Sequence, residues 1–260
     1  MAISTRAPAA LPVCRMVKES YTSVSANWPA VLKMSWAWVL ILWPVRAMLM
    51  HILREATHLS SGVIATWLLF LAAFSAGTAS IAVAWHRLIL LGEQPPPFYL
   101  RVGGPVPPYL ARLLLIGVIG GATALVWTFL LSLLLIPFLV LHLPVSSSAP
   151  EVLSFLIVIL TTLVVSPIAV SLPGVAVGRP MSLRETMRVT KGNVWRMFGG
   201  AVLVYLPAYV IGLIFRLIVS DGAGRIPASL ALDFVNFISA IAGMGFLSLC
   251  YRFFIRTGQE

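Results

Sequence analysis

Three side chains with metal-binding chemistry lie close together near the start of the sequence: His51, Glu55 and His58. Their spacing of four and then three residues places them on one face of a helix. Three ligands of these types suffice for a metal ion. Glu55 and His58 also match the Glu-x-x-His element of carboxylate-bridged di-iron proteins, but such a centre needs a second element that the sequence lacks. The favoured interpretation is a solvated helix at a membrane surface; the alternative is a single-metal site, and with it a membrane enzyme.

The segment from Pro180 to Asn193 carries the clearest sign of a helix outside the apolar stretches. Ser182 and Glu185 fit a capping box, which predicts that a helix begins there. The helical period then separates two faces. One face carries Leu183, Met187, Thr190 and Val194, and another carries a basic stripe of Arg184, Arg188 and Lys191. The pattern indicates a cytoplasmic interfacial helix, either a simple connector or a site for anionic lipid headgroups.

Arg216 and Asp233 are charges set inside apolar runs. A tight turn through residues 221–226 would bring them to the same depth in neighbouring helices. An unpaired charge at such a depth costs roughly 2 to 3 kcal/mol on insertion scales. We therefore predict an ion pair between them that staples two helices, with a substrate or ion site at Asp233 as the alternative.

Other residues with reactive side chains form no recognisable catalytic pattern. No serine nucleophile lies at a readable spacing from a base, and no glycine loop suited to phosphate appears. Cys14 and Cys250 are two lone thiols, which form no disulfide framework and no metal-binding spacing. His86 and Glu93 are interpreted as headgroup or capping contacts. We expect no catalytic residues and no cofactor.

The composition points to a membrane protein. Hydrophobic residues make up 60% of the 260 residues and charged residues 10%, against about 45 to 50% and about 25% in soluble proteins. The mean hydropathy is +0.98 and the net charge is +10. These values exclude a water-soluble globule, and they favour basic loops beside a membrane over a nucleic-acid partner.

Six apolar stretches are long enough for transmembrane helices, which need about 20 residues each. None alternates as a membrane β-strand does. The first stretch is the weakest, because Lys33 and Arg46 must extend toward the two surfaces for it to span; otherwise it lies in the interface and five spans remain. The predicted spans are Val31 to Met50, Gly62 to Leu91, Leu110 to Leu141, Val152 to Val177, Met197 to Ser220 and Ala228 to Tyr251.

The basic residues predict the orientation. When the loops are assigned alternately to two sides, all but four of the 18 Lys and Arg residues fall on the side of the two termini. Basic loops stay in the cytoplasm, so both termini are expected there. The four residues on the opposite side are Arg46, Arg54, Arg216 and Arg225.

The expected organisation is one all-α polytopic domain, residues 31–253, between cytoplasmic tails at 1–30 and 254–260. Residues 62–141 and 152–220 share a layout that suggests a parallel repeat. In each half an Ile-Ala-Val motif is followed by a glycine, Gly92 or Gly178, and later by a Gly-Gly pair, Gly120-Gly121 or Gly199-Gly200. Chance similarity between apolar helices is the competing explanation.

Small residues in the spans predict close helix packing, inside the chain or with a protein partner or second copy. The faces are Ala72, Ala76, Ser80 and Ala84; Gly117 with Gly121; and Ala208 with Gly212. Prolines at 137, 167, 173 and 207 predict bends in the third to fifth spans. The stiff loop around Pro95-Pro96-Pro97 is a spacer or a docking segment.

Two segments carry a resemblance to a known group of proteins. They are Trp85-His86-Arg87 through Gly92-Glu93, and Leu172-Pro173 through Gly178-Arg179-Pro180 with Ser182-Leu183-Arg184-Glu185. They resemble patterns in small uncharacterised bacterial inner-membrane proteins, similar in style to the membrane domain attached to some glycerophosphodiester phosphodiesterases. The resemblance covers about forty residues and leaves out the phosphodiesterase domain. It implies a bacterial inner-membrane protein and carries over no catalytic residue.

The leading hypothesis from the sequence is a non-catalytic integral membrane protein that binds lipid, particularly anionic lipid, or a protein partner. A small transporter or transporter subunit is the alternative, although of its usual features only the prolines are present. A metal-dependent membrane enzyme at His51, Glu55 and His58 is the further alternative.

Overall fold

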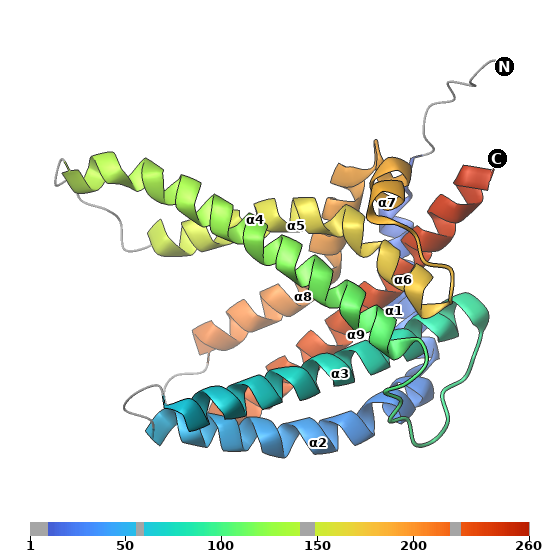
Figure 1. Ribbon diagram of the computed structural model, residues 1–260, viewed down its shortest axis with the longest axis horizontal. Helices are drawn as coiled ribbons and strands as arrows, with labels where there is room; N and C mark the ends of the chain where they lie inside the picture. The colour runs from blue at the N-terminus through green and yellow to red at the C-terminus, as the bar shows by residue number, and fades with distance from the viewer. Residues whose placement is uncertain (1–9, 56–59, 141–148, 219–224, 260) are drawn as a thin grey trace.

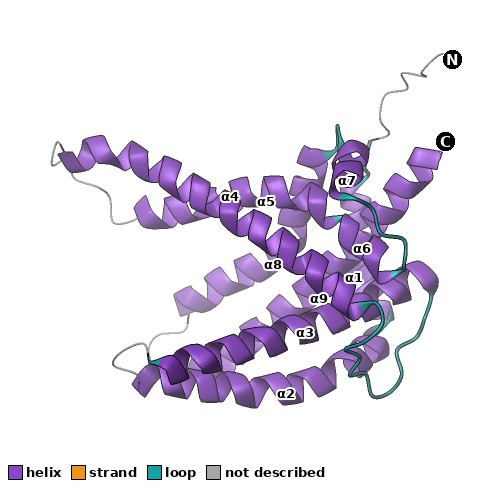
Figure 2. Cartoon of the chain, in the orientation of Figure 1, coloured by secondary structure: helices purple, strands orange, loops and turns teal. Residues whose placement is uncertain are grey.

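The computed structural model describes residues 10–55, 60–140, 149–218 and 225–259. In this part of the chain the regular secondary structure is helical, without strands (Figure 2). The helices are α1 (Val13–Ala26), α2 (Trp28–Glu55), α3 (Ser61–Leu91), α4 (Val106–Val140), α5 (Ala149–Ala169), α6 (Ser171–Ala176), α7 (Leu183–Thr190), α8 (Val194–Ile218) and α9 (Arg225–Gln259).

Within the described residues, six helices are long and apolar enough to cross a membrane, which confirms the all-α polytopic fold. The apolar stretch that contains Lys33 and Arg46 is one of them, because it forms part of the continuous helix α2. The six segments are Trp28–Leu53, Ser61–Leu91, Val106–Leu133, Val152–Ala176, Val194–Phe215 and Leu230–Arg256.

The long helices pack as neighbours along the chain. Helices α2 and α3 lie side by side, as do α4 and α5, and α8 and α9 (Figure 1). The α2–α3 and α4–α5 hairpins diverge away from the end that carries α1, α6 and α7 (Figure 1). Many large apolar side chains of these helices are exposed, Leu125 at 72% and Val118 at 68% among them, as expected for surfaces that contact lipid.

The fourth predicted span is divided into α5 and α6. Pro173 has no N–H to donate to the carbonyl of Ala169, and its ring clashes with that carbonyl in a straight helix. The break therefore falls at Val170, between the two residues. Pro167 and Pro207, by contrast, lie inside α5 and α8 without ending them.

Helix α1 is an element that the sequence analysis assigned to a tail. Met16, Ser20 and Val24 are buried at four-residue intervals, so one face of the helix packs on α8 and α9. The Tyr21 hydroxyl donates a hydrogen bond to the carbonyl oxygen of Val204 at 2.6 Å. The four-residue spacing was the available signal, but the other faces of α1 are polar and masked it.

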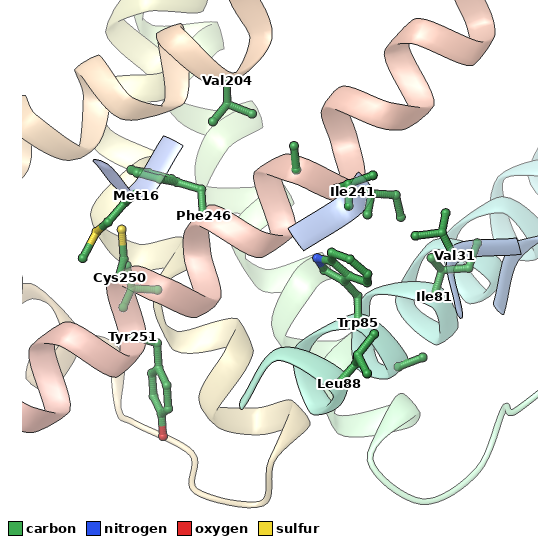
Figure 3. Close-up of a cluster of buried hydrophobic side chains, with 14 of the residues drawn as sticks. Met16, Val31, Ile81, Trp85, Leu88, Val204, Ile241, Phe246, Cys250 and Tyr251 are labelled. Carbon is green, nitrogen blue, oxygen red and sulfur yellow. The ribbon is translucent and has the colours of Figure 1, made fainter. Parts of the chain in front are cut away.

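A core of buried apolar side chains lies where α1, α3 and α9 meet. Trp85 of α3 is fully buried, and Phe246 and Cys250 of α9 line the same core with Met16 of α1 (Figure 3). The Tyr251 hydroxyl extends from this core to the carbonyl oxygen of Arg179 at 3.0 Å. The core therefore joins residues from both ends of the sequence.

The two glycines of the predicted repeat have the same backbone conformation. Gly92 has φ of 73° and Gly178 has φ of 74°, a region that favours glycine. The similarity is confined to the backbone conformation of these two turns. The repeat of residues 62–141 and 152–220 therefore stays a prediction.

Candidate functional site: the basic end of the bundle

The elements that carry most of the basic residues gather at one end of the bundle. They are α1, the end of α3, the loop from Gly92 to Pro105, the start of α4, the turn after α6, α7 and the ends of α8 and α9 next to them (Figure 1). Arg46, by contrast, lies in the second half of α2. The described basic loops that the sequence placed on one side of the membrane are thus neighbours in space.

Helix α7 begins where the capping box predicted. The Ser182 hydroxyl oxygen accepts a hydrogen bond from the backbone N–H of Glu185 at 3.1 Å. Gly192, with φ of 86°, follows the end of the helix. The basic side chains of the predicted stripe, Arg184, Arg188 and Lys191, are all exposed.

The buried face of α7 agrees with the predicted one at Thr190 but not at Met187. Thr186 and Thr190 are fully buried, while Met187 is 58% exposed. The two threonine hydroxyls bond to carbonyl oxygens one turn back, those of Ser182 and Thr186, so their burial leaves no polar group unpaired. The residue spacing had placed the apolar Met187, rather than Thr186, on the face with Thr190.

Beside α7, at the start of α8, Trp195 is 72% exposed and meets the ring of Phe198 edge-on. Tryptophan is enriched at membrane–water interfaces, since its ring is apolar and its N–H is polar. Exposed Met187 and Trp195 therefore place apolar surface next to the basic stripe, a combination typical of interfacial helices.

A cavity of about 630 Å³ opens between α1, the end of α3 and α9. Its lining includes the basic side chains Arg15, Lys18 and Arg252 and the carboxylate of Glu19. Arg15 Nε lies 2.7 Å from Glu19 Oε1, and the Arg252 guanidinium donates to the carbonyl oxygen of Ile89. This site was not predicted from the sequence, because it depends on the packing of α1 against α9.

Arg87 fixes the turn after α3. Its Nε and Nη2 each lie 2.7 Å from a carboxylate oxygen of Glu93, and Nη1 donates to the carbonyl oxygen of Ala176 at 3.0 Å. Glu93, predicted to contact a headgroup or a cap, is thus one half of a two-point ion pair. This pair joins the turn after α3 to α6.

The proline-containing loop after α3 packs against its own chain. The Trp36 indole N–H donates to the carbonyl oxygen of Pro97 at 3.1 Å. Tyr99 is 6% exposed, and this burial raises the pKa of its phenol above the usual value. The loop is therefore anchored to the bundle around Trp36 and Tyr99.

His86 lies inside the bundle, not at a headgroup, so that part of the sequence interpretation was wrong. Its Nδ1 is 2.7 Å from the Ser248 hydroxyl and its Nε2 is 3.1 Å from the Tyr109 hydroxyl. Ser248 and His86 are fully buried and Tyr109 is nearly so. A serine beside a histidine resembles a nucleophile and its base, but burial denies these atoms a substrate, so the network serves to join α3, α4 and α9.

Asp233 is partnered by Arg46 of α2, with Arg46 Nη1 2.7 Å from Asp233 Oδ2. The sequence had suggested Arg216 as the partner. The side chain of Arg216 lies outside the described residues, so a contact between Arg216 and Asp233 stays a prediction. The apolar helix α2 can carry the charge of Arg46 because Asp233 pairs with it.

The metal-ligand candidates lie at the edge of the described part of the chain. His51 is in α2, whereas the side chain of Glu55 and all of His58 lie outside the described residues. Among the described residues, no group of three His, Cys, Asp or Glu side chains is arranged to hold a metal ion. A metal site at His51, Glu55 and His58 therefore remains a prediction from the sequence.

The small-residue faces have different surroundings. Ser80 and Ala84 are buried inside the bundle, and Gly212 lies against Leu232. A Cβ added at Gly117 or Gly121 meets nothing within 4 Å, so this pair is open along α4. Contact of that face with another helix, from a partner or a second copy, stays a prediction.

Comparison of the chain with protein-family models, curated proteins and solved structures finds no match.

Proposed function

We propose that this integral membrane protein is non-catalytic and resides in the bacterial inner membrane, where its basic end faces the cytoplasm and binds anionic lipid. The observation that carries the proposal is the surface of α7 and the start of α8. Three exposed cations, Arg184, Arg188 and Lys191, lie beside the exposed apolar side chains of Met187 and Trp195.

This surface suits an anionic membrane for two physical reasons. Each basic residue near a membrane with negative surface potential contributes about 1 kcal/mol of attraction. The exposed apolar side chains contribute by leaving water for the headgroup region. Electrostatic attraction and burial of apolar side chains then act on the same surface. Such a surface binds a membrane more strongly than basic residues scattered over loops.

The assignment to the bacterial inner membrane rests on the distribution of basic residues and on the resemblance of the two segments around Arg87 and Arg179. Fourteen of the 18 Lys and Arg residues belong to the side that we place in the cytoplasm. That side also carries the negative surface potential required by the proposal.

The test replaces Arg184, Arg188 and Lys191 together by Gln. Native mass spectrometry of the purified protein then measures retention of phosphatidylglycerol against that of phosphatidylethanolamine. We expect selective loss of phosphatidylglycerol, by at most about 3 kcal/mol for the three charges, with unchanged insertion into the membrane.

A matched control removes two exposed charges from the same end but outside α7, Arg101 and Arg256. We expect the control to keep most of the bound phosphatidylglycerol. Equal losses in the control and in the α7 variant, or no loss in the α7 variant, would refute a binding role for α7 and leave its basic residues as topology signals.

A further inference from the structure

The cavity between α1, α3 and α9 has the size and position of a ligand site. Its volume of about 630 Å³ falls within the roughly 300 to 1,000 Å³ of sites for small molecules. Ile89 of α3 and Leu249 of α9 line it from two transmembrane helices, and the other wall is α1. The cavity therefore lies where the bundle meets the polar region of the membrane.

The charges around the cavity favour an anion. Arg15, Lys18 and Arg252 line it together with a single carboxylate, that of Glu19. Arg15 and Glu19 pair at 2.7 Å, so the charges of Lys18 and Arg252 remain uncompensated among the lining residues. Two positive charges match the one or two negative charges of a phosphate group.

The donors that remain available are those of the cations. The hydroxyls of Thr22 and Ser23 donate to the carbonyl oxygens of Lys18 and Glu19, so their protons are already used. Arg252 is held in place by one bond to the carbonyl oxygen of Ile89, which leaves its other N–H groups to bind an anion. The Lys18 ammonium takes part in none of the ion pairs of the described residues, so its three N–H groups are also available.

We infer that this cavity binds a phosphate group, and that the phosphate is carried by a phospholipid of the membrane. The lipid source is favoured by the lining, because Ile89, Leu249 and Ala26 offer apolar surface beside the cations. A basic pocket between transmembrane helices on the cytoplasmic side is a known setting for anionic headgroups. The inference extends the proposed binding of anionic lipid, but it uses residues separate from α7.

Lys18 gives the sharpest test, because it is exposed and bonds no other side chain in the described part of the chain, so its replacement should not disturb folding. Three variants are compared with the unaltered protein: Lys18→Gln, Lys18→Arg, and Lys33→Gln as the matched control. Lys33 is also exposed and near the same end, on α2, and it does not line the cavity. After delipidation, each protein is titrated with phosphatidylglycerol and followed by native mass spectrometry.

We expect Lys18→Gln to weaken phosphatidylglycerol binding about fivefold, the equivalent of one basic contact near the surface. Lys18→Arg should restore most of the affinity, because the charge and donors return, and Lys33→Gln should change it little. A second arm adds inorganic phosphate as a competitor. Phosphate that fails to displace the lipid supports a lipid ligand, whereas displacement at low phosphate supports a phosphate site filled from solution and overturns the choice of lipid.

The outcomes separate this site from α7. Unchanged binding in Lys18→Gln, with a loss in the α7 variant, overturns the cavity site and leaves the proposed function standing. A loss in Lys18→Gln with no loss in the α7 variant supports the cavity and removes the role of α7. No loss in either variant overturns both.

Discussion

Arg46 of α2 and Asp233 of α9 form an ion pair between two transmembrane helices, with 2.7 Å between Arg46 Nη1 and Asp233 Oδ2. The two side chains are 48% and 44% exposed, so the pair lies at the surface of the bundle. In a lipid environment such charges are costly unless they are paired. The ion pair therefore lowers the cost of placing an arginine of α2 and an aspartate of α9 in a membrane.

We predict that Arg46→Ala and Asp233→Ala each destabilise the protein by about 1 to 3 kcal/mol, because each leaves one charge unpaired near the membrane. The double variant should lose clearly less than the sum of the two. Thermal unfolding in detergent and in nanodiscs measures all three losses. The same comparison of single and double variants with Arg216→Ala and Asp233→Ala tests the pair predicted from the sequence. If the two losses of stability simply add, Arg216 and Asp233 are not in contact.

The buried network around His86 should be sensitive to the loss of one hydroxyl. Ser248→Ala leaves Nδ1 of His86 without its partner in a site that excludes water, which costs about 1 to 3 kcal/mol. Ser132→Ala is the matched control, because that hydroxyl is exposed and bonds only to the carbonyl oxygen of Thr128 in its own helix. Thermal unfolding should separate the two variants; equal midpoints would mean that the network contributes nothing to stability.

Neighbouring glycines in α8 offer a second matched comparison. A Cβ at Gly200 would lie 2.1 Å from the Phe246 ring, whereas a Cβ at Gly199 meets nothing within 4 Å. We expect Gly200→Ala to cost about 1 to 3 kcal/mol through overpacking. Gly199→Ala should be neutral or stabilising by up to about 1 kcal/mol, since alanine favours a helix. Unfolding midpoints give the answer, and a harmless Gly200→Ala would show that α8 and α9 do not pack this closely.

The topology can be tested with reporters that are active on only one side of the membrane. Six spans and the basic residue distribution predict that both termini are cytoplasmic. Fusions at the two ends should therefore report the same compartment. A periplasmic signal from the carboxyl end alone would mean that α2 lies in the interface and that five helices span.

The sequence by itself determined the membrane class, the six apolar helices and the start of α7. These features depend on neighbouring residues in the sequence. A helix of about 20 apolar residues spans a bilayer, and the Ser182 hydroxyl caps a backbone N–H three residues away. The break between α5 and α6 has the same local origin, in Pro173.

Only the tertiary structure decided which distant residues meet. The partners of His86 lie 23 and 162 residues away, and Arg46 is 187 residues from Asp233. The basic cavity likewise needs α1 to pack beside α9, and a helix of 14 residues with as many polar as apolar side chains does not show which helix it packs against. Hydrophobic periodicity shows which face of a helix is buried but not which helix covers it, because many apolar surfaces are equally able to do so.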